Sequence, residues 1–154
     1  MRLCGKKQKN MTLNPENHTE IINAFTQQDW KPMLGLIPEI ERTKEFGEIY
    51  GPEKISEGEY TLPVWLNGPL IGRFLEIAYK MPIIVGFNWS AWDEGREMAS
   101  DPNFDFNSID IPTKCKLITA IVRNDRFCDG ALNDAFKSGL MIRILKSIEQ
   151  QLKM

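Results

Sequence analysis

The spacing of apolar residues along the chain predicts a mainly α fold. Apolar side chains recur every three or four residues in several segments, the repeat that gathers them on one face of an α-helix. The clearest of these segments are residues 29–41, 69–81, 89–100, 113–127 and 130–138, followed by a last helix that ends near residue 150. Pro38 predicts a kink or a break in the first of them. We expect a single compact domain of five or six helices.

Residues 46–66 depart from this helical pattern. The segment is rich in Gly and Pro, and its apolar residues come in short pieces at 49–50, 60–62 and 64–66. Such pieces between turn-forming residues favour extended structure over helix. We therefore expect a small β-hairpin or an irregular extended segment between residues 46 and 66.

Charge is unevenly distributed along the 154 residues. Residues 1–10 carry four basic residues and no acid, which leaves 15 basic and 21 acidic residues (net −6) in the remainder. Residues 1–17 are polar, basic and without periodicity, so we interpret them as an N-terminal tail and residues 18–154 as a single helical domain. The acidic body makes a nucleic-acid partner an unfavourable hypothesis, because phosphates are neutralised by clustered Lys and Arg.

Apolar runs and cysteines point to the cytoplasm. No apolar run approaches the roughly 20 residues that cross a bilayer, so we expect no membrane association. The three cysteines, Cys4, Cys115 and Cys128, contain no CxxC pair, which favours free thiols in a reducing compartment over disulfides or zinc. We expect no metal and no cofactor, and an inert, packed thiol at Cys128.

A nucleophile and base pair typical of enzymes is not recognisable in the sequence. His18 is the single histidine and lies in a polar opening segment, where we expect it to be exposed to solvent. The catalytic residues are therefore unknown, and whether the protein is an enzyme stays uncertain, with a non-enzymatic role favoured.

The first candidate site is the stretch from Asp125 to Leu132. On a helical wheel of about 100° per residue, Asp125 falls about 200° from Arg123, inside the apolar stripe of the helix at 113–127. A carboxylate there needs a partner, because an isolated buried charge costs several kcal/mol. Candidate partners are Arg126, Arg96 or the free N–H groups of the next helix, which we expect Asp129 to cap. Arg123 is expected to face solvent or a partner.

The second candidate site is one face of the helix expected at 89–100. Trp89, Trp92, Asp93 and Arg96 have the spacing of neighbours on one helix face. Two aromatic rings beside an Asp–Arg pair suit stacking of a flat ligand or a protein interface. Equally, both rings can be core anchors and the pair a salt bridge. Gly95 indicates close approach by another backbone or a ligand.

The segments Trp92-Asp93-Glu94-Gly95-Arg96 and Leu117 to Leu132 resemble those of a bacterial domain-of-unknown-function family of the DUF6508 type. The resemblance extends over roughly residues 30–145. It implies a shared fold and no particular reaction.

These features support three hypotheses on function. The first is a non-enzymatic protein-interaction or regulatory module, which binds a protein partner or itself through the Trp, Arg and Asp helix face and the corner of Arg123 and Arg126. The second is a nucleotide-like ligand, or a carboxylate-dependent reaction, in a pocket between the helices at 89–100 and 113–128. Nucleic-acid binding through the basic tail is the third and has the weakest support.

Overall fold

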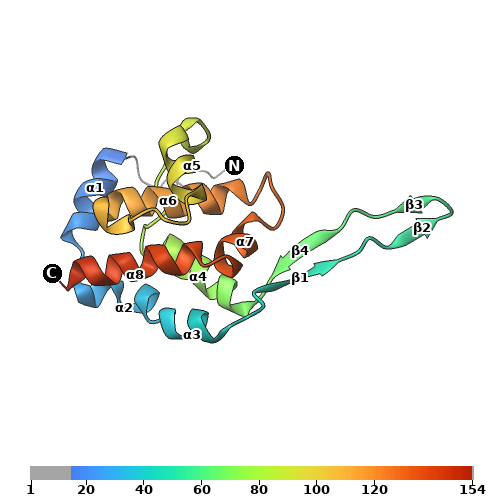
Figure 1. Ribbon diagram of the computed structural model, residues 1–154, viewed down its shortest axis with the longest axis horizontal. Helices are drawn as coiled ribbons and strands as arrows, with labels where there is room; N and C mark the ends of the chain where they lie inside the picture. Colours follow the sequence, from blue (N-terminus) through green and yellow to red (C-terminus); the bar gives the residue numbers. More distant parts are fainter. Residues whose placement is uncertain (1–14, 154) are drawn as a thin grey trace, which may run out of the picture.

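The protein consists of a helical body from which a β-arm projects (Figure 1). The computed structural model describes residues 15–153. Its helices are α1 (Pro15–Ala24), α2 (Gln27–Leu34), α3 (Ile37–Arg42), α4 (Pro69–Lys80), α5 (Asp93–Ser100), α6 (Ile111–Asn124), α7 (Ala131–Lys137) and α8 (Leu140–Leu152). Two 3₁₀ turns, η2 (Trp89–Ala91) and η3 (Phe106–Ser108), lie in the connections. The expected mainly α domain is confirmed.

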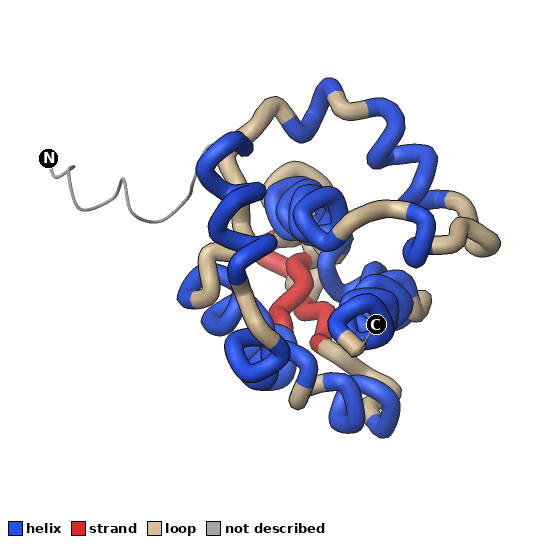
Figure 2. Tube along the Cα trace, turned by 90° about the vertical axis from the view of Figure 1, so that its left-hand side faces the viewer, coloured by secondary structure: helices blue, strands red, loops and turns tan. Residues whose placement is uncertain are grey.

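Four short strands build the arm. Strand β1 (Gly47–Tyr50) pairs antiparallel with β4 (Val64–Asn67), and β2 (Lys54–Ser56) pairs antiparallel with β3 (Glu59–Tyr60) nearer the tip. The small hairpin expected between residues 46 and 66 is therefore confirmed. In the end-on view of Figure 2, helices and the loops between them form the body, and the strands appear behind them, where the arm leaves the body.

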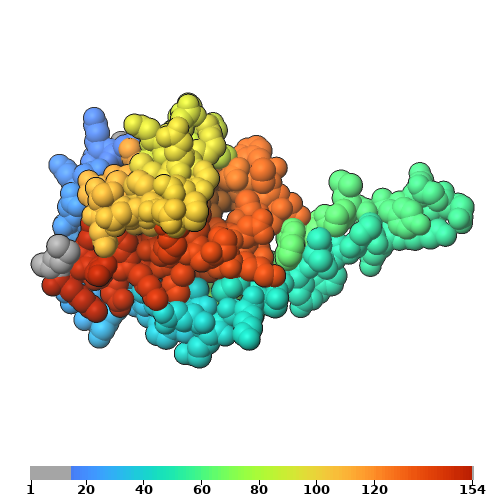
Figure 3. All heavy atoms as spheres, in the orientation of Figure 1, coloured from blue at the N-terminus to red at the C-terminus, as the bar shows by residue number. Residues whose placement is uncertain are grey.

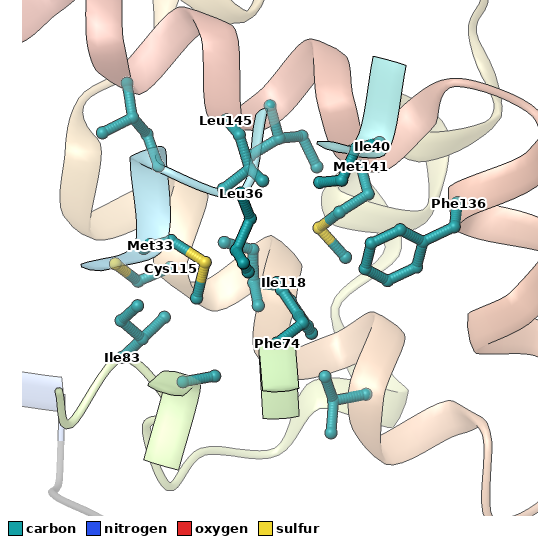
Figure 4. Packing of buried hydrophobic residues seen from close by; sticks show 14 of the residues in the cluster. Met33, Leu36, Ile40, Phe74, Ile83, Cys115, Ile118, Phe136, Met141 and Leu145 are labelled. Carbon is teal, nitrogen blue, oxygen red and sulfur yellow. The ribbon is translucent and has the colours of Figure 1, made fainter. Parts of the chain in front are cut away.

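The core lies where α4, α6 and α8 bring their apolar faces together with α2, α3 and α7 (Figure 4). Phe74 of α4 is fully buried and packs edge-on against Phe136 of α7, with 5.1 Å between the ring centroids. Ile118 of α6 and Met141 of α8 are also fully enclosed. The helical spacing read from the sequence thus identifies the faces that form this core.

Helix starts differ from the expected ones by a few residues. Thr26 caps α2 in a capping box with Asp29, which occupies the third helical position. Asp110 caps α6 by accepting a hydrogen bond from the Thr113 N–H. The expected segment 29–41 divides into α2 and α3 at Gly35 and Leu36, and Pro38 lies in the first turn of α3, where its missing N–H removes no helical bond.

The N-terminal part of the chain begins its helix earlier than expected. Helix α1 starts at Pro15 and packs against α6, so residues 15–17 belong to the helical body and not to the tail predicted for residues 1–17. The remainder of that predicted tail, residues 1–14, lies outside the described residues.

The prediction that His18 is exposed is wrong. His18 retains 1% of its accessible surface, and its Nε2 lies 3.0 Å from the carbonyl oxygen of Ile83. Because a carbonyl only accepts, Nε2–H is the donor. Residues 83–85 form a buried connector, and the hydroxyl of Thr119 accepts a hydrogen bond from the N–H of Val85. His18 and Thr119 therefore bind backbone groups that would otherwise be buried without partners.

Lys114 is a second buried polar residue that the sequence pattern does not single out. It lies at the start of α6 with no accessible surface, and its Nζ donates to Oε1 of Gln151 in α8. Burial lowers the pKa of Lys114 to about 8, because the charged form loses its hydration. This contact joins α6 to the C-terminal end of α8.

We expect His18 to make the free energy of unfolding fall in mild acid. Burial lowers the pKa of His18 below its ordinary value of 6.5. The unfolded chain therefore binds the proton more readily, and stability is lost as pH falls from 6.5 toward the folded pKa. Because the chain has one histidine, its ring-proton resonance reports this pKa directly by NMR.

The control is His18→Gln, which should remove this part of the pH dependence when unfolding by urea is followed at several pH values. A midpoint at or above 6.5 for the wild-type resonance would contradict the account.

Candidate functional site

The β-arm, residues 47–67, is the feature of the molecule that stands most apart from the helical body (Figure 3). Two-stranded hairpins are marginally stable in water when nothing packs against them. Within the arm, Glu53 and Thr61 hold the strands together between the two short sheets through Thr61 N–H to Glu53 O (2.7 Å) and Glu53 N–H to Thr61 Oγ1 (2.7 Å). The arm is therefore a continuous ribbon from base to tip.

Apolar side chains of the arm are exposed on both of its faces. In the β1–β4 register, Ile49 lies opposite Trp65, and Tyr50 lies opposite Val64 on the other face. Leu62, between β3 and β4, is 84% exposed. The exposed apolar residues of the arm are Ile49, Tyr50, Ile55, Tyr60, Leu62, Val64 and Leu66. These side chains make the arm a candidate contact surface, because folded proteins rarely leave a contiguous apolar patch uncovered.

The base of the arm is fixed to the corner between α6 and α7. The carboxylate of Asp129 accepts a hydrogen bond of 2.9 Å from the backbone N–H of Trp65. Gly130 has φ +89°, and a Cβ there would lie 2.5 Å from Cδ1 of the Trp65 ring. Only glycine suits both the left-handed backbone and the close approach of the indole. The expectation that Asp129 caps α7 is wrong, because its carboxylate is used by the arm.

Asp125 caps α7 from a distance of seven residues. Its Oδ1 accepts a hydrogen bond of 2.9 Å from the N–H of Leu132, in the first turn of α7. The side chain is half-buried just beyond the end of α6. One of the partners expected for this carboxylate, the free N–H groups of the next helix, is therefore the one observed, and this bond fixes the corner that carries the arm.

The helix expected at 89–100 is divided. Trp89 lies in the η2 turn and α5 begins only at Asp93, because Trp92 adopts a non-helical backbone conformation with ψ 83°. In this conformation the Trp92 ring covers Gly95, where any Cβ would overlap with it. The prediction that another backbone or a ligand approaches Gly95 is therefore wrong, because the group that lies against it is the indole ring of Trp92.

Asp93 and Arg96 form an ion pair on the surface. Both side chains are mostly exposed, and Arg96 Nη1 also donates to the carbonyl oxygen of Ser90 at 3.1 Å. The salt bridge considered as an alternative for this pair is the arrangement observed. Such exposed pairs contribute little to stability.

A cavity of about 140 Å³ lies between this region and α6. Trp89, Trp92 and Arg96 line one side of it, and Asn124 lies at the α6 side. The other lining residues are small or apolar: Gly95, Ala99, Leu117, Ala120 and Ile121. Three of the predicted site residues thus meet at one cavity. The other five predicted site residues do not line it: Asp93, Arg123, Asp125, Arg126 and Asp129.

Arg123, Arg126 and Phe127 form a surface that we call the α6 corner, together with Trp89. The guanidinium carbon of Arg123 lies 6.0 Å from the centre of the Tyr79 ring, and Arg126 is exposed. Phe127 is 76% exposed, and its ring centroid lies 5.9 Å from that of Trp89. No ion pair to either arginine occurs among residues 15–153. The corner is thus aromatic and carries unpaired cations.

The thiols differ in exposure. Cys115 is fully buried, and burial raises the pKa of its thiol. Cys128 is exposed, so the prediction of a packed thiol at that position is wrong. Cys4 lies outside the described residues. In the part of the chain that the structure describes, no group of three or more His, Cys, Asp and Glu residues is arranged to hold a metal ion. No helix in that part has the length and apolar character that crossing a bilayer requires.

The arm as an exposed surface is the feature that the sequence reasoning missed. A signal for it is present: Tyr60, Leu62, Val64 and Leu66 occupy alternate positions, which places them on one face of an extended chain. The sequence does not reveal that this apolar row has no partner within the chain, since a row of this kind usually faces a core.

Comparison with known proteins gives one family. The model of a protein family described as a family of unknown function (DUF6508) matches residues 25–154. No curated protein and no solved structure matches the chain.

Proposed function

The chain belongs to this family of unknown function, and we propose that it is a non-enzymatic protein-interaction module that binds its partner through the β-arm. The observation that carries the proposal is the exposure of apolar side chains on both faces of the arm, from Ile49 near the base through Leu62 to Ile55 and Tyr60 nearer the tip. A two-stranded ribbon surrounded by water is only weakly stable, whereas a partner that covers it would bury its apolar surface. The helical body then serves as the rigid support.

The two carboxylates between α6 and α7 support the same proposal. Asp125 and Asp129, two of the predicted site residues, bind the backbone of α7 and of β4. These carboxylates therefore hold the arm in position relative to the body. Partner binding also gains when a contact segment is held in place beforehand, because less conformational entropy is lost.

The charges and the reactive side chains support a protein partner over nucleic acid or catalysis. The arm carries four glutamates and one lysine, a net charge of −3, which repels phosphates. His18 and Cys115 are enclosed in the core. Cys115 and Cys128 are free thiols, which supports the proposed cytoplasmic location.

A second candidate function is the binding of a small planar ligand in the cavity between η2, α5 and α6. The lining by Trp89, Trp92 and Arg96 favours it, because indole rings stack on flat rings and a guanidinium binds an anionic group. A nucleoside monophosphate has both features.

Photo-cross-linking in the source cells tests the role of the arm. A benzophenone amino acid at Leu62 should give covalent adducts with a protein, because this side chain is 84% exposed and would lie in the interface. The matched control is the same amino acid at Glu76, an exposed position on α4. Adducts at position 62 that exceed those at position 76 are expected. Equal or absent adducts at both positions would contradict the proposal.

Thermal shift with nucleoside monophosphates tests the cavity. If a base stacks on Trp89 and Trp92, the ligand should raise the Tm of the wild type. It should leave the Tm of Ala120→Phe unchanged, because the added ring fills the cavity. Leu62→Ser, a change in the arm, is the control and should retain the shift. A wild type whose Tm does not respond, or a shift that persists in Ala120→Phe, would remove this candidate.

A further inference from the structure

Resting on the proposed function, we propose that the partner of the arm is a second copy of this chain, and that the arm of each copy docks on the α6 corner of the other. The proposal follows from the complementarity of two surfaces that one chain carries but cannot bring together. The corner is defined by Arg123, Arg126, Phe127 and Trp89, and the arm by residues 47–67.

The arm cannot reach the corner of its own chain. Asp129 and Gly130, next to Phe127, hold Trp65 at the base of the arm, and from there the ribbon runs away from the body (Figure 1). Each strand of about ten residues spans roughly 30 Å at ~3.3 Å per residue. The tip is therefore far from the corner to which the base is attached, and a corner within its reach must belong to another molecule.

The charges of the two surfaces are opposite. The arm has a net charge of −3, and Glu53 is exposed with no ion pair among the described residues. On the corner, Arg126 is exposed and equally without an ion pair in that part of the chain. The neighbouring carboxylates of Asp125 and Asp129 keep their charge but are held by the backbone N–H groups of Leu132 and Trp65, whereas the guanidinium of Arg126 is free to meet a carboxylate of a partner. Opposite charges steer and orient association.

The apolar surfaces also match. The corner exposes Phe127 against Trp89, and the arm exposes Tyr60 nearer its tip and Leu62 midway along it. From their exposed fractions, the seven exposed apolar residues of the arm present on the order of 800 Å² of surface, which is what each partner of a standard-size interface buries. Stacking of the aromatic groups and burial of Leu62 would supply the association energy.

Mutual docking gives a closed dimer. If the arm of one copy contacts the corner of the other, the reverse contact follows by two-fold symmetry, and both arms and both corners are used. The apolar residues on both faces of the arm suit this arrangement, because an arm that lies between the two bodies of a dimer is covered on more than one side. An arm that lay on a flat surface would need apolar residues on one face only.

Charge reversal tests the second copy directly by sedimentation velocity of the full chain over a wide concentration range. The wild type should dimerise, and Glu53→Lys and Arg126→Glu should each weaken the dimer by about tenfold or more, because a favourable pair becomes a like-charge pair. An equimolar mixture of the two variants should dimerise again, since the reversed arm of one chain meets the reversed corner of the other and the unchanged pair remains. Glu76→Lys, the same charge change on exposed α4, is the matched control and should dimerise as the wild type does.

Three outcomes would overturn the second copy as partner: a wild type that stays monomeric, a dimer that Glu53→Lys and Arg126→Glu leave unchanged, or a mixture that stays monomeric. The proposed function stands apart from these outcomes. A monomeric wild type whose position 62 cross-links to a different protein in the source cells would overturn the self-association and support the interaction role of the arm. A monomeric wild type without cross-links at position 62 would overturn both the self-association and the interaction role.

Discussion

The hydrogen bond from the backbone N–H of Trp65 to the Asp129 carboxylate joins the arm to the helical body, and the direction of the arm depends on it. The contact works because Gly130 leaves room for the Trp65 ring and because Asp125 fixes the start of α7 beside it. A charged acceptor makes such a bond stronger than one between neutral groups. The stretch from residue 125 to 132 is thus a bracket between two helices and a ribbon.

The core of the body holds this bracket in place. α6 and α8 pack their apolar faces through a shared core, and α7 lies across their ends, so the corner moves only if the core does. Rigid packing of this kind transmits position from the core to the surface. The arm is short of contacts of its own, and the core supplies the fixed base that it needs.

The helices could be predicted from the sequence because local rules decide them. Apolar residues at helical spacing identify the buried faces of α4, α6 and α8, and the turn residues around β1 and β4 identify the hairpin. Asp125 could be recognised as a carboxylate in need of backbone donors, since an unpaired buried charge is too costly.

Other features depend on contacts between distant parts of the chain. His18 is in a polar segment, yet the carbonyl of Ile83, 65 residues away, gives it a buried partner. Asp129 has a position in the sequence that is typical of a helix cap, yet its carboxylate accepts a hydrogen bond from β4. The break before α5 accompanies the packing of the Trp92 ring against Gly95. Helical spacing contains no information on any of these contacts.

Hydrogen exchange measured by mass spectrometry on Asp129→Ala tests the bracket most directly, with Asp134→Ala, an exposed aspartate on α7, as the matched control. Asp129→Ala should speed exchange in β1 and β4 by about tenfold or more, because a charge-assisted bond is lost, while α8 keeps its protection. Asp134→Ala should change neither. Unchanged exchange in β1 and β4 of Asp129→Ala, or an equal increase throughout the chain, would contradict the claim that this carboxylate holds the arm.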